Sequence, residues 1–322
     1  MRVISEEQAE HFLTKGYVVV HDCFTREAAD EYLQTVWTRL GYDPADRSTW
    51  AEPSVHMPFH REVDIRRFAP KAWSAVCDLL GGEERIALPY NWTDGFIVNL
   101  WEGADEPWAP ASAQASGWHK DGDFFRHFLD SPEQGLLTLV LWSDVRHQGG
   151  ATFVAADSVG PVARYLAQHP EGVLPSEFPY ADLVGQCTDF VEATGSFGDV
   201  FLIHPYVLHA KAQNVLRLPR IITNPPVTLA EPMRFDRPDA ADFSLVERAV
   251  LRALGVDRYE FRPTMPREKV VPERIRRQEL MKAAEQGRLH TPGHGRPANG
   301  RSGSAGRVSG TMSGRPAPPA RA

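Results

Sequence analysis

Short β-rich runs between residues 86 and 223 constrain the fold of this chain more than any other feature of its sequence. They combine β-branched and large apolar residues and are separated by turn-forming residues; the clearest are 95–100, 136–142, 150–154 and 200–204. A series of short strands of this kind is typical of a sandwich or barrel of antiparallel strands. The chain is therefore predicted to be mainly β, with a jelly-roll or cupin-like core and flanking helices.

Helical patterns precede and follow this segment. Ser5 can cap a first helix, with Gln8 in the capping-box position, and Gly16 ends it. The apolar spacing after Thr25 predicts a second helix that closes at Gly41. Further helices are expected at 71–80, 158–168, 243–254 and 273–286, a first strand at 17–20, and irregular structure at 42–68.

The chain is predicted to form a single domain over residues 1–286, followed by a tail. Helical N-terminal elements precede a β core at about 86–227, and C-terminal helices follow it. The segment 287–322 is rich in Gly, Pro, Ser and Arg and has almost no residue to bury, so it is predicted to be disordered.

The distribution of charge argues against nucleic acid as a partner. The tail holds six Arg and no acidic residue, so the rest of the chain has 29 of the 35 basic residues against all 42 acidic ones. A folded body this acidic is poorly suited to binding a phosphate backbone. An RNA-binding role of the tail is the alternative, and six scattered Arg support it weakly.

Cysteine usage and the N-terminus predict a cytoplasmic protein. Cys23, Cys77 and Cys187 are far apart, odd in number and outside any CxxC pattern, as is typical of reduced thiols. The opening residues, MRVISEEQAEHF, lack the apolar stretch of a signal peptide, and no run approaches the ~18 apolar residues of a membrane span. We expect no membrane partner, and the oligomeric state does not follow from the residues.

A candidate metal site lies in the stretch SGWHKDGDFF. His119 and Asp121 are two residues apart, so on an extended strand their side chains point to the same side. An imidazole nitrogen and a carboxylate oxygen suit a divalent metal of intermediate softness, and His209 is the best third ligand. Two His and one carboxylate form the facial triad that is typical of non-haem Fe(II) oxygenases. The alternative is a structural His–carboxylate pair.

Other histidines leave alternatives open. His204 is the rival third ligand, but Pro205 interrupts its strand, and we interpret His204 as structural. His127 lies in the substrate pocket or on the surface. His56 and His60 are equally open as lid or pocket residues.

Arg220 follows eleven residues after His209, at the start of another apolar stretch. An Arg inside a β-rich core needs an anionic partner, because an unpaired buried charge is very costly. A small dicarboxylate bound beside the metal would supply that partner through a bidentate salt bridge. The alternative is an ion pair with one of the chain's own carboxylates.

The order of these motifs resembles the phytanoyl-CoA dioxygenase-like family of Fe(II)/2-oxoglutarate-dependent oxygenases. The His-x-Asp pair is followed by Gly198-Asp199, His209, Asn214 and Arg220, and the opening GYVVVHDCF between two helices is also similar to that family. The resemblance covers residues 5–227. It implies a double-stranded β-helix fold.

The resemblance also implies a site. Fe(II) would be held by His119, Asp121 and His209, and Arg220 would bind the distal carboxylate of 2-oxoglutarate, with O2 as the second cosubstrate. Asn99, in FIVNLWEG, resembles the Asn that contacts the cosubstrate in related hydroxylases. Lys211 departs from the pattern, because many relatives carry a small hydroxyl residue there. The loop 103–117 is unusually long, as lids often are.

The function implied is hydroxylation of a C–H bond in a small organic metabolite, with release of succinate and CO2. The carboxylate of Asp121 argues against halogenation, because similar halogenases have a small residue in its place. The alternatives are a catalytically inactive relative that acts as a binding module and a non-oxidative metal-dependent enzyme. Aromatic residues crowd the motifs and are interpreted mainly as core, with pocket lining as the alternative: Trp92, Trp101, Trp118, Trp142, Phe124, Phe125 and Phe128.

Overall fold

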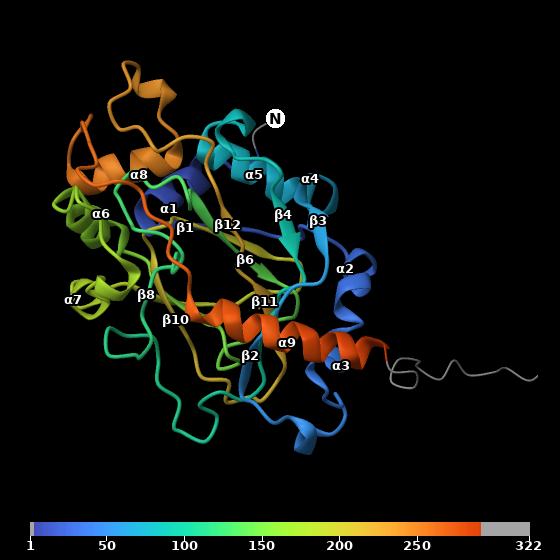
Figure 1. Ribbon diagram of the computed structural model, residues 1–322. Helices are drawn as coiled ribbons and strands as arrows, with labels where there is room; N and C mark the ends of the chain where they lie inside the picture. Colours follow the sequence, from blue (N-terminus) through green and yellow to red (C-terminus); the bar gives the residue numbers. More distant parts are fainter. Residues whose placement is uncertain (1–2, 291–322) are drawn as a thin grey trace, which may run out of the picture.

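The structure is a computed structural model that describes residues 3–290 (Figure 1). The helices are α1 (Glu6–Lys15), α2 (Arg26–Leu33), α3 (Val36–Leu40), α4 (Ile65–Phe68), α5 (Pro70–Leu80), α6 (Val159–Ala167), α7 (Tyr180–Val184), α8 (Leu245–Leu254) and α9 (Glu273–His290). The strands are β1 (Tyr17–Val20), β2 (Ser54–His56), β3 (Glu62–Asp64), β4 (Asn91–Thr93), β5 (Ile97–Asn99), β6 (Leu136–Leu141), β7 (Thr152–Ala155), β8 (Phe190–Ala193), β9 (Val200–Ile203), β10 (Leu208–Lys211), β11 (Arg220–Thr223) and β12 (Pro226–Val227).

Two antiparallel sheets form the core. The larger sheet has the strand order β1-β9-β6-β11-β5-β2, with β12 also paired to β6, and the smaller sheet has the order β10-β7-β8. Within the described residues β3 and β4 pair separately as a hairpin. This arrangement confirms the predicted fold class, a mainly β jelly-roll core with flanking helices.

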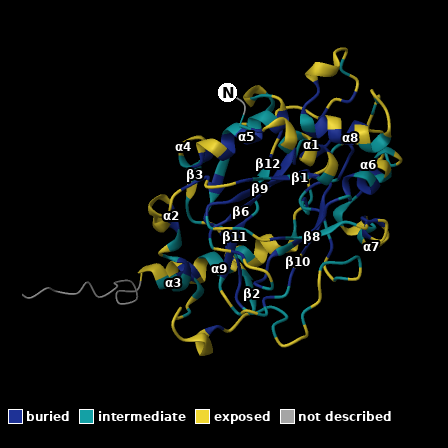
Figure 2. Cartoon of the chain, turned by 180° about the vertical axis from the view of Figure 1, so that it is seen from behind, coloured by how far each residue is buried: buried dark blue, intermediate teal, exposed yellow. Residues whose placement is uncertain are grey.

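Two neighbouring strands inside the larger sheet, β6 and β9, are covered on both faces. Every residue of β6 and β9 is buried, so these strands are apolar runs without polar alternation. Helices cover one side of this sheet: α1 and α5 pack on β1, and α8 packs on both α1 and α6 (Figure 1). Figure 2 shows the resulting pattern, with dark blue strands inside and exposed residues on the outer helices.

The local predictions for most helices are confirmed. Ser5 and Gln8 form the predicted capping box of α1, and Gly16 ends that helix in a left-handed conformation (φ 72°). The single helix predicted between Thr25 and Gly41 is instead divided into two. α2 ends before residues 34–35, and α3 begins after them. The last helix extends to His290, beyond the predicted end at 286.

The segment predicted to be irregular, 42–68, contains short elements. β2 pairs with β5 at the edge of the larger sheet, β3 pairs with β4, and α4 follows directly. These strands are three residues long and depend on distant partners, so no local pattern identifies them. Residues 291–322, the greater part of the predicted disordered tail, lie outside the described residues. No helix within 3–290 is both long and apolar enough to cross a membrane.

Candidate metal centre and cavity

Strand pairing brings His119 and His209 together. His209 lies on β10, and His119 lies on a loop segment that pairs with β10 as an isolated antiparallel bridge. The His119 amide donates to the His209 carbonyl at 3.0 Å, and the His209 amide donates to the His119 carbonyl at 2.8 Å. Directly opposed residues point to the same face of a sheet, so the two rings lie side by side, with centroids 4.4 Å apart.

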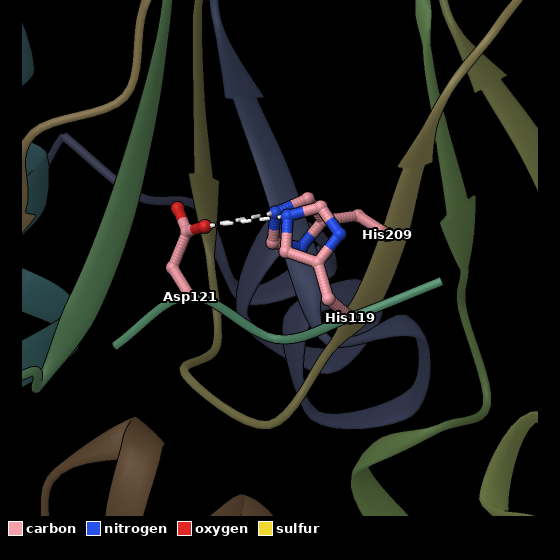
Figure 3. Close-up of side chains that lie close together, drawn as sticks. All are labelled: His119, Asp121 and His209. Carbon is pink, nitrogen blue, oxygen red and sulfur yellow. Dashed lines mark ion pairs between the residues drawn. The ribbon is translucent and has the colours of Figure 1, made fainter. Parts of the chain in front are cut away.

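Asp121 completes the cluster (Figure 3). Its Oδ1 lies 3.5 Å from His119 Nε2 and 3.4 Å from His209 Nε2. The potential ligand atoms of these three residues all lie within 4.8 Å of one another. The structure therefore gathers the predicted triad at one point in space.

Backbone carbonyls set the tautomer of both imidazoles. His119 Nδ1 lies 2.8 Å from the Gly117 carbonyl, and His209 Nδ1 lies 3.2 Å from the Val207 carbonyl. A carbonyl oxygen can only accept a hydrogen bond, so each Nδ1 carries the hydrogen when the ring is neutral. Each Nε2 then presents a lone pair toward Asp121, which is the arrangement that metal-ligating histidines use.

Burial and the neighbouring charges within the cluster shift the pKa values of Asp121 and His119. Burial by itself would raise the pKa of Asp121, but the adjacent His209 and His119 outweigh it and hold that pKa well below its usual range. Burial opposes a charged His119, whereas the hydrogen bond that its protonated ring would donate to Asp121, together with the charge of Asp121, raises its pKa overall. Asp121 is thus an ionised carboxylate facing two imidazoles, which is the charge state that a metal ligand requires.

Asn224 holds the other carboxylate oxygen, and the sequence did not identify it. Its Nδ2 donates to Asp121 Oδ2 at 2.7 Å, while Oδ1 faces the two imidazoles. Asn224 immediately follows β11, whereas Asp121 lies 103 residues earlier. The hydrogen bond fixes the orientation of the carboxylate plane.

Arg220 lies in the same cavity and has no acidic partner. It is 1% exposed, and its Nε donates to the Gly150 carbonyl at 2.6 Å. Its Nη2 is buried without a hydrogen-bond partner, and no carboxylate within residues 3–290 forms an ion pair with it. Burial lowers the pKa of Arg220 to about 10, so the side chain remains a cation at neutral pH. The alternative of an internal carboxylate partner is therefore not observed in this part of the chain.

A cavity of about 1,160 Å³ connects these groups. Both sheets contribute to its walls, which include Ile97, Leu139 and Ile222 from the larger sheet and Thr152, His209 and Lys211 from the smaller one. The triad, Arg220 and Asn224 all line it. The cavity thus lies between the sheets of the jelly roll and is large enough for a cosubstrate and a second small molecule.

The structure places Asn99 outside the described cavity wall. Asn99 is opposite Arg220 in the pairing of β5 with β11, but it is completely buried. Its Oδ1 accepts from the Glu102 amide at 3.1 Å, and its Nδ2 donates to the Ala212 carbonyl at 3.5 Å. Both amide atoms are therefore engaged by backbone. Lys211 does reach the cavity, where its ammonium pairs with Glu102 at 2.6 Å.

The remaining histidines have separate environments. His204 lies apart from the triad and is 1% exposed, with Nδ1 accepting from the Tyr206 amide and Nε2 facing the Val246 carbonyl. His127 is buried against Lys120, at 2.7 Å between Nδ1 and the ammonium. His56 lines the cavity from β2, and His60 binds Glu285 of α9 at 2.8 Å.

Most of the aromatic residues near the motifs belong to the core, as interpreted from the sequence. Those that are buried are Trp92, Trp118, Trp142, Phe125 and Phe128, and Trp101 packs against the core. Phe124 is the member of this set that lines the described cavity.

Comparisons with known proteins find distant structural relatives. No family model and no curated protein sequence matches the chain. Similar solved structures include EctD from S. alaskensis with 2-oxoglutarate and 5-hydroxyectoine (19% identity, 69% of this chain, 74% of that chain, TM-score 0.40). They also include the non-heme alpha ketoglutarate dependent carbocyclase SnoK from nogalamycin biosynthesis (15% identity, 71% of this chain, 86% of that chain, TM-score 0.42). A third is HygX from Streptomyces hygroscopicus with nickel and 2-oxoglutarate (14% identity, 68% of this chain, 85% of that chain, TM-score 0.36). At these TM-scores the similarity assigns no function to this chain.

Proposed function

We propose that this chain is an Fe(II)- and 2-oxoglutarate-dependent dioxygenase that hydroxylates a C–H bond of a small organic metabolite and releases succinate and CO2. One observation carries this proposal: a His-Asp-His cluster and a buried Arg220 without an acidic partner line the same cavity. The order of the motifs favours the phytanoyl-CoA dioxygenase-like branch of these enzymes.

The donor set fits Fe(II). Two imidazole nitrogens and one carboxylate oxygen match a metal of intermediate softness, and three protein ligands leave other coordination positions free for cosubstrates. Arg220 fits 2-oxoglutarate, because a buried guanidinium with an unsatisfied Nη2 is complementary to a distal carboxylate. The cosubstrate contact predicted for Asn99 stays a prediction; the backbone contacts of its amide also support the strand opposite Arg220.

The bound metal with 2-oxoglutarate and O2 would supply the oxidising chemistry. The chain supplies position. His119, Asp121 and His209 would hold the metal, and Asn224 would keep the carboxylate in its binding orientation. Arg220 would fix the far end of the cosubstrate, at a point in the cavity where its own side chain is 1% exposed.

Two broader proposals accompany this function. We propose that residues 1–286 form one domain, which is supported by the pairing of β1 with β9 and by the packing of α9 on α3. We also propose a cytoplasmic location, supported by the free thiols of Cys23, Cys77 and Cys187.

The test compares two 2-oxo acids on two proteins. Anaerobic Fe(II)-loaded protein would be titrated with 2-oxoglutarate and with 2-oxobutyrate, which lacks the distal carboxylate, by calorimetry and visible absorption. Arg220→Gln should weaken 2-oxoglutarate binding by about 30-fold or more, the equivalent of about 2 kcal/mol, because the carboxylate loses its charged partner. The affinity for 2-oxobutyrate should not change.

Asp121→Ala is the control for the metal, and it should abolish Fe(II) binding. Wild-type protein that binds Fe(II) without responding to 2-oxoglutarate would instead indicate a non-oxidative metal enzyme. Folded protein that binds neither would indicate a binding module. If Arg220→Gln lost affinity for both oxo acids to the same extent, the assignment of Arg220 to the distal carboxylate would be contradicted.

A further inference from the structure

Helix α9 forms part of the cavity wall. Arg274, Gln278 and Lys282 are spaced four residues apart, so they lie along one face of the helix. All three line the cavity, together with Ile275. Figure 1 shows the orange α9 crossing the sheet beside β2 and β11, whose residues line the same cavity. A segment far beyond the β core thus reaches the site that holds the triad.

Polar contacts fix α9 in this position. Within the described span of the helix, Glu285 is the one buried side chain. Its Oε2 lies 2.8 Å from Arg39 Nε and 2.8 Å from His60 Nε2, and Arg39 is completely buried. At the other end, Arg274 pairs with Asp123 at 2.6 Å, two residues after Asp121. The helix is therefore held at both ends by ion pairs, and the face between these anchors is directed at the cavity.

Within the described residues, that face adds one unpaired cation to the site, Lys282, because Arg274 on the same face pairs with Asp123. The basic residues among the described lining residues are Lys120, Lys211, Arg220, Arg274 and Lys282, and the acidic ones are Glu62, Asp121 and Asp123. Lys282 forms no ion pair within residues 3–290, and its ammonium lies 4.5 Å from the ring centre of Phe59. Among the basic residues, Arg274 pairs with Asp123 and Lys211 pairs with Glu102. A half-buried cation beside an aromatic wall is well placed to attract an anion.

The walls around this cation are apolar. Phe59 is 44% exposed and Leu88 is 48% exposed, and both line the cavity. Phe124 and Ile275 line the same cavity. A ligand that fits this surface has an apolar body and one acidic group.

We infer that α9 forms a wall of the active site that determines specificity, and that Lys282 on this helix receives an anionic group of the substrate. This inference rests on the proposed function and refines it, because it assigns the substrate to the small organic acids. Arg220 receives the cosubstrate carboxylate, whereas Lys282 lies on a separate element and receives the substrate. Lys282 thus selects acids over neutral molecules of the same shape.

The test uses two dyes with one scaffold. Anilinonaphthalene sulfonate carries an anionic group, and phenyl naphthylamine is its neutral counterpart. Binding of both would be measured by fluorescence on the full chain, with and without Fe(II) and 2-oxoglutarate. Lys282→Gln should weaken binding of the sulfonate dye by about tenfold, while the neutral dye is unaffected, because a hydrogen bond to a charged group is lost. Lys282→Arg should retain the sulfonate preference.

Controls separate this inference from general charge effects and from the proposed function. Arg252→Gln removes a cation that pairs with Glu10 outside the described cavity wall, and it should leave both dyes unchanged. Circular dichroism would verify that each variant keeps its helices. Equal affinity of the wild-type protein for both dyes, or an equal loss in Arg252→Gln, would overturn the inference. Failure of the proposed function would appear separately, as missing Fe(II) or 2-oxoglutarate binding in the same proteins.

Discussion

At the scale of single residues, the orientation of Asp121 depends on Asn224. One carboxylate oxygen faces both imidazoles, and the other accepts from Asn224 Nδ2 at 2.7 Å. Asn224→Ala should weaken Fe(II) binding by about tenfold to a hundredfold, because the carboxylate is then free to rotate away from the site. Anaerobic titration against a chelating dye would measure the change. Asn91→Ala is the matched control, since Asn91 lines the cavity but bonds Glu62; equal affinities in the two variants would contradict the role of Asn224.

The sequence could identify residues whose role is visible in the spacing to their near neighbours in the chain. The spacing of His119 and Asp121 predicts that they converge, and the structure shows that they do. Asn224 carried no such pattern, because its partner is 103 residues away. Asn99 had a suggestive position, but the chain folds backbone groups of Glu102 and Ala212 onto its amide. Side-chain partners supplied by distant backbone cannot be predicted from spacing alone.

At the scale of elements, α9 depends on one buried ion pair. Glu285→Ala would remove the anchor to Arg39 and His60, leaving Asp94 as the remaining acidic partner of the buried guanidinium. Amide hydrogen exchange within 273–290 should accelerate by about a hundredfold, the equivalent of about 3 kcal/mol, while the central strands keep their protection. Leu280→Ala changes a side chain that is 71% exposed on the same helix, and it should have no effect. Unchanged protection in Glu285→Ala would show that other contacts hold α9.

Elements with local start and stop signals were predictable, whereas elements made by pairing were not. Ser244 and Glu247 cap α8 in the same way that Ser5 and Gln8 cap α1, and both helices were expected. β2 forms because its backbone pairs with β5, and its three residues contain no strand pattern of their own. The break between α2 and α3 likewise lacks Gly or Pro, so the continuous apolar spacing predicted one helix.

At the scale of the whole molecule, His204 joins three parts of the fold. It lies at the end of β9, its amide donates to the carbonyl of Gly16 after α1, and its Nε2 faces the Val246 carbonyl on α8. Its Nδ1 accepts from the Tyr206 amide at 3.1 Å, so the neutral ring satisfies one donor and one acceptor. Burial lowers the pKa of His204 to about 3, because an added proton would face that amide without water.

This neutral histidine should make the whole fold sensitive to mild acid. In the unfolded chain a histidine has a pKa of about 6.5, so between about pH 6.5 and about pH 3 the unfolded state binds a proton that the folded state excludes. Stability is therefore fully present above this window and falls with decreasing pH by up to about 1.4 kcal/mol per pH unit. His204→Asn should reduce the pH dependence of the free energy of urea unfolding between about pH 7 and about pH 5 by about 1 kcal/mol per unit on average, whatever its effect at neutral pH. The lowered pKa of Asp121 changes stability only at pH values below the usual carboxylate range, outside the interval from about pH 7 to about pH 5.

His11→Asn is the control, because His11 is exposed, and it should keep the wild-type slope of unfolding free energy against pH. An unchanged slope in His204→Asn would mean that His204 takes up its proton in the folded state.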